Sequence, residues 1–215
     1  MKKPALGFSL IELLVSISII AILTAVGYVN FKNSTEASRD SDRRSDLRSL
    51  QTAIELYKSD NGRYPEGCRG AGVWSGQTDS SYACASGNQY IVGLAPKYIQ
   101  TLPIDPKPLS TADSGYLYTV NSDGTVYKIM VKNTVESEAV TYAHEFKSCQ
   151  VTNNSSGMCD ATYPSNNKPS WCQANNAQFQ KSYALWGGYA NVAPNVASAD
   201  TLIERRTEDI ICDVQ

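Results

Sequence analysis

The stretch GFSLIELLVSISIIAILTAV, residues 7–26, combines a long apolar run with a single carboxylate at Glu12. Only a few small polar residues and Glu12 interrupt the apolar character between Phe8 and Phe31. A helix over residues 8–31 would extend roughly 36 Å, which is enough to cross a bilayer. We therefore predict a membrane-spanning helix over 8–31. Placing an unpaired carboxylate in the hydrocarbon of a membrane costs free energy, so the presence of Glu12 requires an explanation.

The seven residues before this run, MKKPALG, carry two lysines, and the run lacks the small-residue exit of a secretory signal peptide. We expect the apolar segment to stay on the protein as a single membrane pass. The basic residues after it outnumber Lys2 and Lys3, which by charge alone would place the C-terminal part in the cytoplasm. The cysteines favour the opposite orientation, with the C-terminal part outside the cytoplasm.

The cysteine pattern indicates disulfides rather than a metal site. There is no C-x-x-C pair and only one histidine, His144, so zinc-ligand spacing is absent. An even count predicts three disulfides in an oxidising compartment, and the alternative is six unpaired buried thiols. Short loops favour pairing 68 with 84 and 159 with 172, which leaves 149 with 212. The six residues are Cys68, Cys84, Cys149, Cys159, Cys172 and Cys212.

The helix is predicted to continue beyond the membrane to about Ser59, because no proline or turn signal interrupts the chain before that point. Leu47, Leu50 and Ile54 recur at helical spacing, with Ala53 and Tyr57 in support, so residues 32–60 form an amphipathic half that packs on a globular head. Asn61-Gly62 and Pro65 then end the helix. We interpret the charged run 36–48 as a solvated face or a contact between subunits rather than as a binding patch.

A β-hairpin is predicted over residues 116–131, where two β-branched and aromatic runs flank a turn at 121–124. One face of the hairpin can cover the apolar stripe of the helix. The fold class is therefore α+β: a long helix packed on a small antiparallel sheet. We expect the sheet head in 61–148 and a cysteine-rich C-terminal elaboration in 149–215. That elaboration is either a variable exposed surface or a set of loops held by disulfides.

Three motifs resemble those of one family. A basic leader ends at Gly7 and is followed by Phe8 and an apolar run with Glu12 at its fifth position. This pattern resembles the N-terminal signature of type IV pilins and pseudopilins. "ELYKSDNGRYP" and "GLAPKYIQTLPIDP" are similar to segments of the major pseudopilins of type II secretion and of minimal pilins. The resemblance implies a pilin-like fold, consistent with the pattern above.

The resemblance also implies processing and assembly. A membrane aspartyl protease, the prepilin peptidase, would cut between Gly7 and Phe8 and N-methylate Phe8. Glu12 would then face the Phe8 amine of a neighbouring copy in a filament, and such pairing offsets the cost of burying both charges. The alternative is a tolerated polar residue near a helix end. The implied partners are further copies of the chain, the peptidase, the membrane and an assembly machine driven by a cytoplasmic ATPase.

No metal or cofactor is expected. The major pseudopilin binds calcium in its C-terminal loops, and Asp105, Asp113 and Asp123 offer carboxylates here. Their spacing does not match an oxygen-ligand loop, so we assign them to turns instead.

The composition argues against several function classes. A net charge of −2 gives no reason to expect a nucleic-acid partner, and no catalytic motif is present. The preferred hypothesis is a structural subunit of a type IV pilus-like filament for adhesion, motility or DNA uptake. It would lie in the inner membrane before assembly and on the cell surface afterwards. The alternatives are a pseudopilin of a type II secretion system and, more remotely, a membrane-tethered binding module or enzyme.

Overall fold

The computed structural model describes residues 9–85, 87–107, 109, 111, 114–148 and 175–188. The expected cleavage site at Gly7 and Phe8 lies outside these residues. So do Asp113, Cys149, Cys159, Cys172 and Cys212. Predictions that concern those positions remain predictions.

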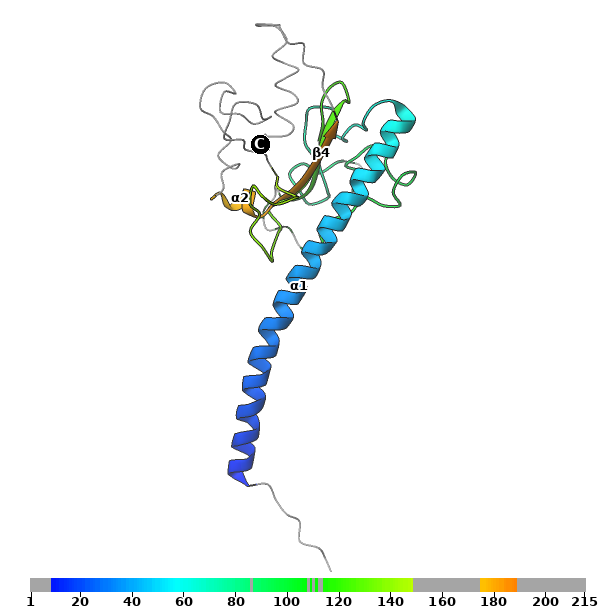
Figure 1. The fold of residues 1–215 in the computed structure, drawn as a ribbon. Coiled ribbons are helices and arrows are strands. Elements are labelled where there is room, and N and C mark those ends of the chain that lie inside the picture. The colour runs from blue at the N-terminus through cyan, green and yellow to red at the C-terminus, as the bar shows by residue number, and fades with distance from the viewer. Residues whose placement is uncertain are drawn as a thin grey trace, which may run out of the picture.

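One helix, α1 (Leu10–Asn61), makes up a quarter of the chain and gives the molecule its elongated shape (Figure 1). Its N-terminal half extends away from the head, and its C-terminal half lies along one side of the head. The helix ends at Gly62, which adopts a left-handed conformation (φ 76°) and donates its N–H to the Lys58 carbonyl. A glycine tolerates this conformation without strain, so the predicted end of the helix is confirmed.

A four-stranded antiparallel sheet forms the head, in the order β1 (Ser75–Gly76), β2 (Gly115–Val120), β3 (Val126–Lys132) and β4 (Tyr183–Gly188). The predicted hairpin is confirmed as β2 and β3. In its turn, Gly124 takes φ 66° and donates its N–H to the Asn121 carbonyl. The side-chain oxygen of Asn121 accepts the N–H groups of Thr125 and Val126, which fixes the register.

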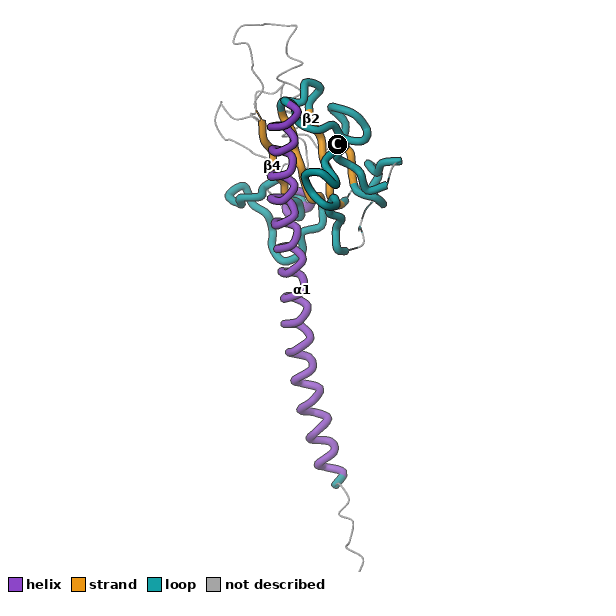
Figure 2. The backbone as a smooth tube through the Cα atoms, turned by 90° about the vertical axis from the view of Figure 1, so that its right-hand side faces the viewer, coloured by secondary structure: helices purple, strands orange, loops and turns teal. Residues whose placement is uncertain are grey.

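The main core lies between α1 and one face of this sheet, and Figure 2 shows the C-terminal half of the helix lying over the sheet. Alternate residues of the hairpin point toward the helix, as the period-2 pattern requires. The predicted helix stripe is buried at Leu47, Leu50, Ala53 and Ile54, with Tyr57 packed against it. The sheet contributes Tyr116, Tyr118, Val120, Tyr127, Ile129, Val131 and Tyr183.

The opposite face of the sheet carries a smaller apolar cluster. It contains Leu117, Met130 and Ala184, together with Phe179 from the short helix α2 (Ala177–Gln180). β4 therefore belongs to the sheet, where it pairs with β3, whereas the sequence pattern predicts 183–188 within a C-terminal elaboration. Two consecutive glycines end this strand, so its sequence lacks the alternation of apolar and polar residues that indicates a strand.

A disulfide joins Cys68 to Cys84 and closes the loop that carries β1. This is the pairing that the short sequence separation of 16 residues favours. The bond constrains a segment with little regular structure, where cross-linking limits the entropy of the unfolded chain.

Candidate assembly helix and its buried ion-pair network

The N-terminal half of α1 exposes its apolar side chains all the way round. An 18-residue window in this half has a mean hydropathy of 2.4 and is 0% buried, so the helix is long and apolar enough to cross a membrane. Exposed fractions reach 82% at Leu10 and 73% at Phe31. An apolar surface of this length requires lipid or other protein to cover it.

Three hydroxyl groups in this half bond to the helix's own backbone. Ser16, Ser18 and Thr24 each donate to the carbonyl four residues earlier, at 2.7–2.8 Å. Such bonds remove the need for an outside partner for these hydroxyls, which suits a helix in an apolar environment. Between Leu10 and Phe31, Glu12 is the one residue with an ionisable carboxylate or basic side chain.

Glu12 lies in the first turn of α1, and one carboxylate oxygen accepts the backbone N–H of Ser9 at 2.8 Å. The side chain is exposed. A carboxylate at this position also interacts favourably with the positive end of the helix dipole. The predicted partner, the Phe8 amine of a neighbour, lies outside the described residues, so that pairing remains a prediction.

At the other end of the exposed region, where the head begins, Arg43 is fully buried. Its guanidinium holds Asp105 through two parallel hydrogen bonds, Nε to Oδ2 at 2.9 Å and Nη2 to Oδ1 at 2.8 Å. Its third nitrogen, Nη1, donates to Asp40 at 2.7 Å and to Glu136 at 3.1 Å. One arginine therefore ties α1 to the segment before β2 and to the segment after β3.

The network continues around Glu136 and is balanced in charge. Arg39 also binds Glu136 through two hydrogen bonds, at 2.7 and 2.8 Å, and Lys107 reaches the same carboxylate at 2.7 Å. Three cations, Arg39, Arg43 and Lys107, thus face three anions, Asp40, Asp105 and Glu136. Mutual pairing offsets the cost of removing these charges from water.

Asp40 completes the link between helix and head. Its carboxylate accepts the backbone N–H groups of Glu136 and Ser137 as well as the Ser137 hydroxyl. Charge-assisted bonds of this kind are among the stronger hydrogen bonds in proteins. These bonds therefore fix the position of the segment after β3 along the axis of α1.

The pairing alters the pKa values of the network. Burial lowers the pKa of Arg43, but hydrogen bonds and charge attraction from Asp105, and hydrogen bonds from Asp40 and Glu136, outweigh it and raise the pKa overall. The hydrogen bond from Arg39 is the main cause that lowers the pKa of Glu136 from 4.5 to about 2. Burial opposes that effect, while Lys107 and Arg43 add to it. The raised pKa of Arg43 and the lowered pKa of Glu136 both favour the charged forms of these two groups.

The pKa of Glu136 predicts that part of the stability is lost in acid. Because its folded-state pKa is lowered, the contribution is complete above about pH 4.5 and disappears as pH falls toward 2. At about 1.4 kcal/mol per pH unit it amounts to roughly 3 kcal/mol. Urea unfolding of the wild type and of Glu136→Gln should show a difference of this size at pH 6 that vanishes by pH 2. A difference that is constant with pH would contradict this.

The structure corrects two interpretations drawn from the sequence. The run 36–48 is not simply a solvated face or a contact between subunits, because Asp40 and Arg43 are fully buried. Asp105 does more than serve a turn, since it binds Arg43. Asp123 does lie in the hairpin turn. The overlooked signal is spacing: Asp40 and Arg43 extend the stripe of Leu47, Leu50 and Ile54 by another turn.

Within the part of the chain that the structure describes, no group of three or more His, Cys, Asp or Glu side chains is arranged to hold a metal ion.

Comparison with known proteins agrees with this geometry. Residues 2–28 match the family described as "Prokaryotic N-terminal methylation motif". The type II secretion system core protein G of Aeromonas hydrophila is 31% identical over 105 residues, which cover 49% of this chain and 69% of that protein. The core protein G of Dickeya chrysanthemi is 32% identical over 73 residues, 34% of this chain and about half (48%) of that protein.

A pilin is also similar. The type IV major pilin protein PilA of Myxococcus xanthus is 37% identical over 60 residues, covering 28% of this chain and 27% of that protein. No solved structure gives a significant match. The N-terminal motif, the relatives and the long helix packed on a four-stranded sheet lead to one conclusion. The chain belongs to the family of type IV pilins and type II secretion pseudopilins.

Proposed function

We propose that this chain is a structural subunit of a thin helical filament of the pseudopilus type, and that it serves type II secretion. The observation that carries the proposal is the exposed apolar half of α1, which is continuous with the half that packs on the head. The secretion alternative is favoured over the pilus hypothesis because both core G proteins described above align over more of this chain than the pilin does.

Each segment of the chain would have its own role in maturation and assembly. Residues 1–7 are the leader, which a prepilin peptidase removes before it methylates Phe8. Residues 8–31 hold the subunit in the cytoplasmic membrane and later pack in the filament, and residues 32–60 attach the helix to the head. The head, 61–148, and the segment 149–215 face away from the cytoplasm. The subunit acts by assembly rather than by catalysis.

A type IV pilus subunit is the second candidate function. The match to the Myxococcus xanthus type IV major pilin, 37% identical over 60 residues, supports it. In that case the filament would extend from the cell surface and serve attachment, motility or DNA uptake.

Electron microscopy of surface-sheared material, combined with N-terminal analysis of the protein, tests the proposal. We expect a chain that starts at N-methylated Phe8 in the membrane fraction, with no long surface fibres, and a deletion strain that fails to secrete exoproteins. Long fibres of the same processed chain, with secretion intact in the deletion strain, would identify a pilus subunit instead. An uncut chain that starts at Met1 would contradict both functions.

A further inference from the structure

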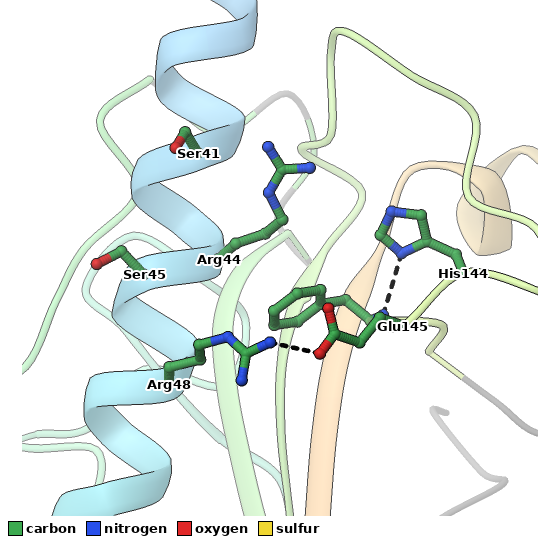
Figure 3. Close-up of a pocket in the computed structure, with 7 residues that line it drawn as sticks. Ser41, Arg44, Ser45, Arg48, His144 and Glu145 are labelled. Atoms are coloured by element: carbon green, nitrogen blue, oxygen red, sulfur yellow. Dashed lines mark hydrogen bonds and ion pairs between the residues drawn. The ribbon is translucent and has the colours of Figure 1, made fainter.

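An open groove of about 440 Å³ lies between α1 and the loop 141–147. Figure 3 shows Arg44 and Arg48 extending from the helix toward the loop that carries His144 and Glu145. The groove is lined by Ser41, Arg44, Ser45, Arg48, His144, Glu145 and Phe146.

The two guanidinium groups in the groove rest on aromatic rings. Arg48 lies 5.0 Å from the centroid of the Phe146 ring, and Arg44 lies 5.8 Å from that of Tyr183. Arg48 pairs with Glu145, but the two side chains are 56% and 67% exposed. Exposed ion pairs contribute little to stability, so a carboxylate from outside can take the place of Glu145. Arginine stacked on aromatic rings is a frequent composition at protein interfaces.

The other edge of the exposed helix face is acidic. Asp42 lies about 160° around the helix from Arg44 and is exposed. Among the described residues it makes no hydrogen bond or ion pair. Asp46, one turn further along, accepts the Tyr116 hydroxyl at 2.7 Å. Burial raises the pKa of Asp46, against the effect of that hydrogen bond, and the charges of Asp42 and Asp105 raise it further. This edge therefore presents a carboxylate, that of Asp42, which no described basic side chain pairs with.

We propose that Asp42 of one copy enters the groove of the next copy and pairs with Arg48. The inference rests on the proposed function, because it names a contact within the filament. Since the donor and the acceptor lie on opposite edges of one helix, each copy can give Asp42 to one neighbour and receive another neighbour's Asp42. A contact of this head-to-tail kind, when it does not close into a ring, produces a helical filament.

A second copy fits the groove because the complementary charge is on the same helix, next to the exposed apolar half that also needs covering. Asp42 and Arg48 are six residues apart, so neighbouring parallel helices joined by this pair would be offset by about 9 Å along the axis. The contact would thus define the axial position of each head relative to the next.

Charge reversal tests the pair. Arg48→Asp and Asp42→Arg, each expressed as the full chain with its assembly machinery, should lower the amount of polymer at least tenfold. The double variant should return it to within about threefold of wild type. Co-expression of the two single variants should also restore polymer, because the arginine introduced in one can meet the aspartate introduced in the other. The matched controls are Arg63→Asp and Asp123→Arg, which reverse exposed charges elsewhere on the head and should leave polymer unchanged.

The possible outcomes distinguish a failure of the Asp42–Arg48 contact from a failure of the proposed filament function. Wild-type polymer levels in both single variants would overturn the Asp42–Arg48 contact and leave the proposed function standing. So would a failure of the double variant and of co-expression to recover polymer, provided that urea unfolding shows the heads to be as stable as wild type. A wild-type chain that forms no polymer would overturn the proposed function, and the contact with it.

Discussion

Replacing Arg43 by methionine is expected to lower the free energy of unfolding by about 3–5 kcal/mol, since it leaves buried charges without their partner. Asp105 would lose both of its bonds to the guanidinium, and Asp40 would lose its bond to Nη1. Both carboxylates are shielded from water where α1 meets the head, because Asp40 is 0% and Asp105 8% exposed. Methionine is unbranched like the arginine stem and fills the space of that stem without a charge, so the loss measures mainly the removal of the guanidinium.

Urea unfolding of the full chain in detergent, followed by tryptophan fluorescence, measures this loss. Arg44→Met is the matched control, one residue along the same helix, where Arg44 and its partner Glu138 have side chains 34% and 35% exposed. A pair so accessible to water contributes at most about 1 kcal/mol. Equal, small losses in both variants would show that the Arg43 network does not hold the head to the helix.

A double variant tests whether Arg43 and Asp105 stabilise the fold through their mutual interaction. Adding Asp105→Asn to Arg43→Met removes one of the stranded charges, so part of the lost stability should return. Residues within one network give such non-additive effects, whereas independent sites add. A double variant that loses the sum of the two single losses would mean that Arg43 and Asp105 act separately.

The sequence predicted those parts of the fold that depend on local patterns. The spacing of Leu47, Leu50 and Ile54 predicts one buried helix face. The alternation on both sides of the 121–124 turn predicts one hairpin. Each pattern arises within a single local element. The disulfide Cys68–Cys84 was predictable because it closes a short loop. In each case the residues that determine the structure are close in sequence.

The buried network was not predictable in this way, because its partners are far apart in the chain. Arg43 meets Asp105 across 62 residues, and Arg39 meets Glu136 across 97. On α1 alone, Asp40 and Arg43 resemble charges on a solvated face, and only the packing of two head segments against them produces burial. β4 was missed for a similar reason, since it joins the sheet by pairing with a strand more than 50 residues earlier.

Glu12→Gln is expected to be cleaved normally and to lower filament assembly at least tenfold. In the assembled state the carboxylate would face the methylated Phe8 amine of a neighbour inside an apolar packing of helices, where an unpaired buried charge costs several kcal/mol. A loss of about 1.4 kcal/mol per contact is already a factor of ten in association. Cleavage should be unaffected, because the expected cut lies on the other side of Phe8.

The Glu12→Gln substitution removes the charge of the side chain but keeps an oxygen that can accept a hydrogen bond at the start of the helix. The carboxylate accepts the Ser9 N–H in the single chain, and a glutamine oxygen at this position can accept the same bond. Glu12→Ala removes both the charge and the bond, whereas Ser16→Ala removes only a hydroxyl that bonds the helix's own backbone and serves as the control. Immunoblots of the sheared and membrane fractions, with N-terminal analysis of the chain, measure assembly and cleavage together. If Glu12→Gln assembles like wild type while Glu12→Ala does not, Glu12 acts as a helix cap rather than as the partner of Phe8, and another contact must neutralise the amine.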